Sequence, residues 1–136
     1  MKKILFLILI ATSFAFNGNA QTQVQNNTNC EVSVTVRCYD LCVWGITNGP
    51  YTVSPAGIGN VKDCNLGSSS AVSTIYEVCV SDATNCNPPD CVFVVGPGNG
   101  NTCGLTIGSS LTNCPDCSQF GGTMNVTYTG TQIIVN

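Results

Sequence analysis

The Cys-x-x-Cys motif at 114–117 is the stretch of this sequence whose residue types and spacing most resemble a reactive site. Two cysteines at this spacing serve in thiol–disulfide enzymes, in zinc sites and in structural disulfides. A redox motif needs a helix that starts at its first cysteine, because the helix dipole lowers the thiol pKa. Here the segment 118–122 reads Ser-Gln-Phe-Gly-Gly, a poor helix start. The motif therefore favours a structural role over a thiol–disulfide enzyme that uses Cys114 and Cys117.

The remaining cysteines support the structural interpretation. A zinc site would need two more thiolates, for which Cys38 with Cys42, or Cys86 with Cys91, have usable spacing. An even number of cysteines in a secreted chain instead predicts a disulfide framework, and no metal is expected. Cys114 and Cys117 would then close a small ring or tie the final hairpin to two partners, and a Cys86–Cys91 bridge would pinch the loop between them. The framework has ten members: Cys30, Cys38, Cys42, Cys64, Cys79, Cys86, Cys91, Cys103, Cys114 and Cys117.

The first 20 residues predict a secretory signal peptide. Lys2 and Lys3 form a basic start, an apolar run follows from 4 to 16, and Gly18 and Ala20 are the small residues of a cleavage site. The pattern resembles a bacterial Sec signal. We expect a secreted protein, extracellular or at the cell surface, with the periplasm as an alternative, and no membrane insertion after cleavage.

The composition of the mature chain excludes several function classes. Removing residues 1–20 leaves two basic residues, Arg37 and Lys62, against seven acids, a net charge of −5. So few cations cannot neutralise a row of phosphates, so no nucleic-acid partner is expected. The chain has no histidine, which excludes a Ser-His-Asp triad and histidine-ligated metals. The glycine-rich segment 96–104 lacks the lysine of a phosphate loop, and no cofactor is expected.

Periodicity predicts an all-β domain over 30–136. Residues 31–39 alternate strictly between valine or cysteine and polar side chains, as in a half-buried strand. Turn signals recur every 8 to 12 residues, and no window has helical spacing. We predict a disulfide-rich antiparallel β-sandwich, Ig-like or of Greek-key type, with about seven to nine short strands. Residues 21–29 carry one apolar side chain and predict a flexible N-terminal arm.

The boundaries of the individual strands follow from apolar runs and turn signals. Residues 91–95 form a continuous apolar run, typical of a strand buried on both faces, and 96–101 reads as a loop. Asn48-Gly49-Pro50 predicts a turn. The other expected strands span 43–47, 51–54, 58–62, 71–81, 105–107, 124–128 and 131–135.

Two binding sites compete with structural interpretations. Trp44, with Tyr39 and Tyr51 nearby in sequence, could form an aromatic platform for a sugar, although a lone tryptophan beside a cysteine more often packs on a disulfide. The loop 81–90 brings four oxygen-bearing side chains together, which calcium prefers, although such residues are also common in turns. These four are Asp82, Asn85, Asn87 and Asp90.

Together these features predict a non-enzymatic structural or adhesive protein, with a self-assembling subunit as one form. In that form other copies would be its partners, through β-augmentation by the N-terminal arm or at sheet edges. The alternative is a small secreted module that binds a glycan or a surface protein.

Overall fold

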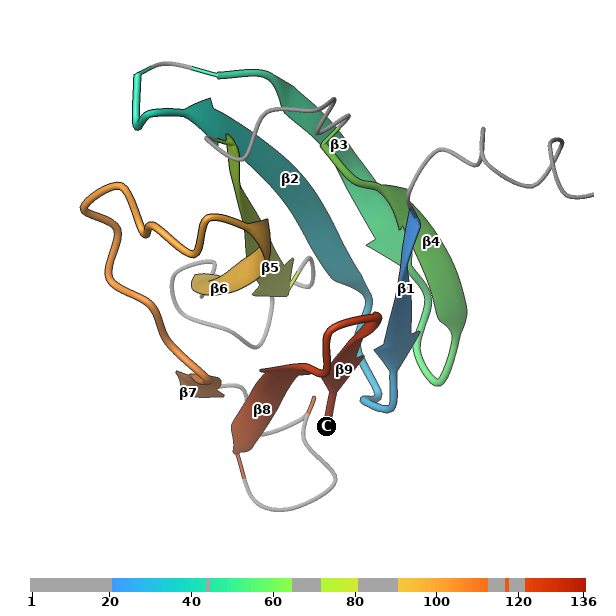
Figure 1. The fold of residues 1–136 in the computed structure, drawn as a ribbon. Coiled ribbons are helices and arrows are strands. Elements are labelled where there is room, and N and C mark those ends of the chain that lie inside the picture. The colour runs from blue at the N-terminus through green and yellow to red at the C-terminus, as the bar shows by residue number, and fades with distance from the viewer. Residues whose placement is uncertain (1–20, 44, 65–71, 81–90, 113–116, 118–121) are drawn as a thin grey trace, which may run out of the picture.

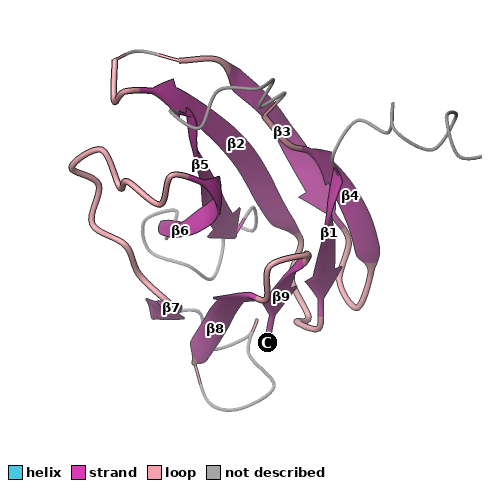
Figure 2. Cartoon of the chain, in the orientation of Figure 1, coloured by secondary structure: helices cyan, strands magenta, loops and turns pink. Residues whose placement is uncertain are grey.

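The computed structural model describes residues 21–43, 45–64, 72–80, 91–112, 117 and 122–136. These ranges contain strands, turns and loops and no helix (Figure 2). The nine strands are β1 (Gln21–Asn26), β2 (Val32–Asp40), β3 (Thr47–Val53), β4 (Ile58–Lys62), β5 (Val72–Val80), β6 (Cys91–Gly98), β7 (Ser110–Thr112), β8 (Thr123–Tyr128) and β9 (Gln132–Val135).

The strands form two sheets that pack face to face (Figure 1). One sheet has five strands in the order β4-β1-β9-β8-β7, and the other has four in the order β3-β2-β5-β6. The prediction of a disulfide-rich β-sandwich is confirmed. One pairing departs from the antiparallel expectation, because β1 runs parallel to β9.

The core lies between the sheets and follows from alternation along the strands. On β2, Val32, Val34 and Val36 are fully buried, while the intervening polar residues face outward. The opposite sheet supplies a similar set, in which Val24 of β1 and Ile133 of β9 are fully buried. Each aliphatic side chain removed from water in this way contributes about 1.5–3 kcal/mol.

The prediction of a flexible arm over 21–29 is wrong, because these residues complete the five-stranded sheet. β1 pairs with β4 from Gln21 opposite Lys62 to Gln25 opposite Ile58, and its other edge pairs with β9. Beyond the strand, the amide of Asn27 donates to the Val135 carbonyl at 2.8 Å. The arm has too few apolar side chains to fold alone, but two neighbouring strands satisfy its backbone groups.

Buried polar side chains fix β1 in place. The Asn26 Nδ2 group donates to the carbonyl oxygens of Cys30, Val53 and Ser54 at 2.7, 3.1 and 3.0 Å. Its Oδ1 accepts from the amide and hydroxyl of Thr28 at 3.0 and 2.7 Å. Both side chains are fully buried. Asn26 therefore ties the end of β1 to the turn that follows it and to the end of β3.

The predicted strand at 43–47 and turn at 48–50 are also wrong, because β3 begins at Thr47 and runs through Gly49 and Pro50. β3 lies at the edge of its sheet, where a proline that lacks an N–H is tolerated. The pairing with β2 shifts register between Val34 and Val36 at this point. Gly49 has a φ of +105°, and a Cβ there would lie 2.9 Å from the Val34 carbonyl oxygen, so the irregular edge needs glycine.

The predictions around β6 also need correction. The strand continues to Gly98 instead of giving way to a loop after Val95, and its burial alternates, so only one face is fully covered. Gly96 allows this extension, since a Cβ there would lie 2.4 Å from the ring of Tyr76. The predicted strand 105–107 is reduced to one bridge between Ile107 and Phe93, and β7 forms after it.

Four disulfides link the described cysteines: Cys30–Cys117, Cys38–Cys64, Cys42–Cys103 and Cys79–Cys91. A Cys114–Cys117 ring and a Cys86–Cys91 bridge are therefore both wrong, because Cys117 and Cys91 have other partners. Cys86 and Cys114 lie outside the described residues, as do the predicted signal peptide and the loop 81–90. Four disulfides indicate an oxidising, extracellular-type environment.

Candidate functional site

The described residues of the connection between β2 and β3 have an irregular backbone that is crosslinked to another loop. Leu41 and Cys42 both have positive φ angles, 47° and 60°. Cys42 is bonded to Cys103, which anchors this end to the loop after β6. Gly45 then passes so close to β2 that a Cβ would lie 1.3 Å from the Cys38 carbonyl oxygen. A disulfide thus crosslinks this end, and the close approach of its backbone to β2 leaves room only for glycine at position 45.

The same connection exposes three aliphatic side chains to solvent. Leu41, Val43 and Ile46, which we call the apolar hairpin end, are 72%, 70% and 71% exposed. Single exposed apolar residues are ordinary, whereas three on one short connection are a candidate contact surface. The same connection contains Trp44, which lies outside the described residues. In the sequence, this surface could be recognised only from the apolar run Leu-Cys-Val-Trp-Gly-Ile. Its apolar character instead suggested a strand.

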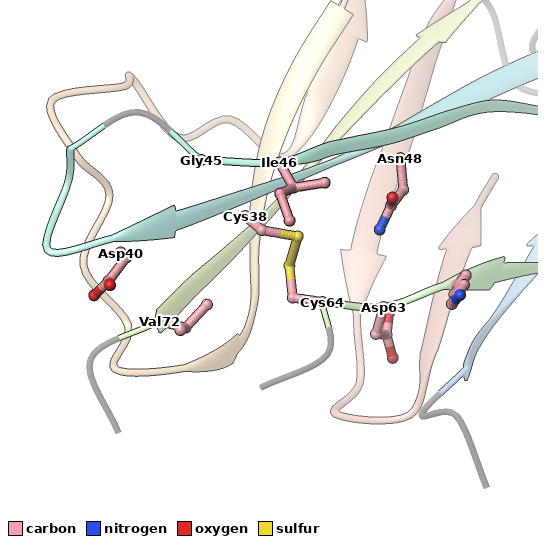
Figure 3. Close-up of a pocket in the computed structure, with 9 residues that line it drawn as sticks. Cys38, Asp40, Gly45, Ile46, Asn48, Asp63, Cys64 and Val72 are labelled. Carbon is pink, nitrogen blue, oxygen red and sulfur yellow. A yellow bond between two sulfur atoms is a disulfide. The ribbon is translucent and has the colours of Figure 1, made fainter. Parts of the chain in front are cut away.

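A pocket of about 410 Å³ opens beside the apolar hairpin end (Figure 3). Ile46, Val72 and the Cys38–Cys64 disulfide give it apolar surface. Polar groups come from other elements: Asp40 at the end of β2, Asn48 on β3, and Lys62 and Asp63 at the end of β4. Gly45 and these eight residues complete the described lining. A partly apolar concavity with a few convergent polar groups is the usual form of a binding site.

Asp63 is the buried acid of this pocket, with 6% of its surface exposed. Its Oδ1 accepts from the Tyr76 hydroxyl at 2.7 Å, and its Oδ2 accepts from the Thr22 hydroxyl at 2.9 Å. Thr22 lies on β1 and Tyr76 on β5, so the carboxylate joins the two sheets. Burial raises the pKa of the Tyr76 phenol, and the neighbouring Asp63 carboxylate raises this pKa further. Burial and the same carboxylate raise the pKa of Tyr128, whose ring lies 5.4 Å from that of Tyr76.

The raised pKa of Tyr76 predicts a loss of stability in alkali. An unfolded tyrosine ionises near pH 10, whereas the folded Tyr76 keeps its proton above that value. The stabilisation is therefore fully present below about pH 10 and is lost as the pH rises above it. We expect the urea midpoint to fall between pH 9 and pH 11. Tyr76→Phe should be less stable at neutral pH but show a flatter alkaline profile; an equally steep profile in that variant would contradict this assignment.

The predicted aromatic platform is not assembled by its two described members. Tyr51 lies opposite Val34 in the β-register and packs against the core. Tyr39 belongs to the outward-facing residues of β2, so the two rings are on opposite faces of one sheet. The alternation of side chains along a strand accounts for this separation. Trp44, the third member, lies outside the described residues.

The outward face of the four-stranded sheet carries a separate charged cluster. The Arg37 guanidinium donates to Glu77 Oε2 from Nε at 2.8 Å and from a terminal nitrogen at 2.5 Å. The same guanidinium lies 5.8 Å from the centre of the Phe93 ring. Arg37 is more than one-third exposed, so this ion pair contributes little to stability. The cluster is satisfied internally and leaves no free charge for a ligand.

The described residues do not assemble a metal site. Glu77, Cys79 and Cys91 come within 4.8 Å of one another, but the two sulfurs are bonded to each other and Glu77 pairs with Arg37. The zinc alternative fails for the same reason, because Cys38, Cys42 and Cys91 are all in disulfides. The predicted calcium ligands Asp82, Asn85, Asn87 and Asp90 lie outside the described residues.

Known proteins give no further guide to this site. Among the described residues there is no helix of the length and apolar character required to cross a membrane. Comparisons with protein-family models, with curated proteins and with solved structures find no match.

Proposed function

We propose that this chain is a secreted, non-enzymatic bacterial protein that adheres to a partner surface through the apolar hairpin end. The observation that carries the proposal is the exposure of Leu41, Val43 and Ile46 on a backbone pinned by the Cys42–Cys103 disulfide. Burying these side chains against a partner would remove their apolar surface from water. A backbone that a disulfide already constrains loses less conformational entropy on binding, which favours affinity.

The chemistry of the described residues supports a binding role over a catalytic one. The sequence has no histidine, and Cys117 of the Cys-x-x-Cys motif is fully buried in a disulfide with Cys30. In a thiol–disulfide enzyme the second cysteine of the motif must be able to pair with the first, and here it is bonded to Cys30 instead. The net charge of −5 that we predict for the mature chain also favours a partner other than nucleic acid.

Self-assembly by donation of the N-terminal segment has less support than adhesion. β1 occupies its own sheet between β4 and β9, so it would have to be withdrawn before another copy could receive it. Two sheet edges are also poor templates for strand addition. The edge strand β3 carries Pro50, and β7, at the edge of the five-stranded sheet, has three residues.

The proposal is tested by replacing Leu41, Val43 and Ile46 together with serine. Cells that lack the protein would be complemented with the wild type or the triple variant, and their retention on a surface would be measured under flow. We expect a loss of adhesion of about tenfold or more, because full burial of one aliphatic side chain is worth about 1.5–3 kcal/mol and tenfold in affinity corresponds to about 1.4 kcal/mol. The thermal unfolding midpoint should stay close to wild type, since the three side chains are exposed.

Ile58→Ser is the matched control. Ile58 is 67% exposed, close to the 71% of Ile46, but it follows the other end of β3. It should leave adhesion unchanged. Equal losses from Ile58→Ser and from the triple variant would show that apolar surface in general, and not the hairpin end, is responsible. Full adhesion by the triple variant would overturn the proposal.

A further inference from the structure

The Asp63 carboxylate lacks a positive partner in the part of the chain that the structure describes. Only the Arg37–Glu77 ion pair occurs there, and Asp63 is held by two hydroxyl groups. A carboxylate that is 94% buried is costly unless a cation compensates it. Each of its oxygens accepts one hydrogen bond and has a second lone pair. Asp63 also lines the pocket, on the opposite side of the Cys38–Cys64 disulfide from Asp40 (Figure 3).

The rest of the pocket fits a cation that is carried on an alkyl chain. Asp40 adds a second, exposed carboxylate, and the Asn48 side chain adds an amide oxygen. Ile46, Val72 and the Cys38–Cys64 disulfide offer the apolar contacts that methylene groups need. Lys62 is the one positively charged residue of the described lining and would repel a cation. Its side chain is exposed and forms no ion pair within the described ranges.

An unsatisfied hydroxyl lies close to the same pocket. Thr74 is 1% exposed, and its Oγ1 has no hydrogen-bond partner. It lies opposite Cys38 in the β-register and two residues after Val72, and both of these residues line the pocket. Thr74 itself is not part of the described pocket lining. A buried polar atom without a partner costs about 1–3 kcal/mol, so a polar group that reached this hydroxyl would be stabilised by it.

We propose that the pocket binds an alkylammonium or guanidinium group, namely a lysine or arginine side chain of the protein on which the apolar hairpin end docks. The inference rests on the proposed function, since Ile46 belongs both to the hairpin end and to the pocket. The cation lies against the Asp63 carboxylate, and its methylene groups pack on Ile46 and the disulfide. Asp40, on the other side of the disulfide, adds attraction at longer range (Figure 3). The net negative charge that we predict for the mature protein favours basic partners.

The direct test is an NMR titration of the oxidised mature protein with small probes. Butylammonium carries the proposed group, while 1-butanol and butyrate keep the chain and change the charge. Shifts of the Ile46, Asn48 and Cys64 amides should report butylammonium at an affinity at least about tenfold above that of 1-butanol, the equivalent of 1.4 kcal/mol. Lysine blocked at both termini should bind like butylammonium. Equal binding of the three butyl probes, or no binding of blocked lysine, would overturn the inference.

Variants assign the binding to these residues. Asp63→Asn should lower butylammonium affinity by about tenfold or more. If that variant does not fold, the exposed rim residues still decide the matter. Asp40→Asn should lower affinity and Lys62→Gln should raise it, each by about two- to threefold in this solvent-screened position. Changes in the opposite directions would contradict the inference. The triple serine variant could lose adhesion while the wild-type protein fails to bind butylammonium. That combination would support the proposed function and reject only this ligand.

Discussion

A mature chain that begins at Asn27, and so lacks Gln21–Asn26, is expected to lose cooperative unfolding altogether. β1 lies between β4 and β9, so its removal separates β4 from the rest of its sheet. The deletion also removes Val24 from the core, Thr22 from the Asp63 network, and Asn26 from the turn that follows β1. Small domains have about 5–15 kcal/mol of total stability, which losses of this kind exceed.

Near-UV circular dichroism and urea unfolding measure this effect. The truncated protein should lack the near-UV signal of packed aromatic rings and show no sigmoidal transition. Deletion of Gln21 alone is the control, because that side chain is exposed and should matter little. A truncated protein that unfolds at the wild-type midpoint would show that the segment is a flexible arm, as its sequence suggests.

Asn26→Ala should be the most damaging single substitution in the β1 segment. It leaves three backbone carbonyls and the Thr28 hydroxyl without the partner that they have in the wild type. Each buried group left unsatisfied costs about 1–3 kcal/mol, and these terms are not fully additive. We expect the free energy of unfolding to fall by about 3 kcal/mol or more, measured by urea denaturation with the disulfides intact.

Asn60→Ala is the control for this substitution. Asn60 lies on β4, the strand next to β1, and its side chain is exposed. Its replacement should change the free energy of unfolding by less than about 0.5 kcal/mol. If both variants lost similar amounts, the buried Asn26 network would not be what stabilises this corner.

The sequence predicted the sandwich because local alternation encodes β2 and β8–β9 well. β1 escaped prediction because its stability is non-local. The side chains of Thr22 and Asn26 point inward. A hydropathy pattern predicts that such polar residues are exposed, even where hydrogen bonds satisfy them in the core. The parallel pairing with β9 joins segments more than 100 residues apart, which no local pattern can reveal.

The candidate site was missed for similar reasons. The apolar run around Val43 favoured a strand, but a disulfide to Cys103 and two positive φ angles turn it outward. Asp63 follows Lys62 at the end of a strand. Nothing in this pair of charged residues indicates that Lys62 is exposed and Asp63 is buried. Disulfide connectivity depends on which strands become neighbours. The partner of Cys117 could therefore not be predicted from the sequence either.

Site-specific photo-crosslinking on intact cells tests the adhesive role most directly. A photoreactive amino acid would replace Val43 in one protein and Ile58 in another, and each would be irradiated while the protein holds cells to a surface. We expect covalent adducts from position 43 and none above background from position 58. Adducts from position 58 with none from position 43 would contradict it, because the contact would then lie at the opposite end of β3.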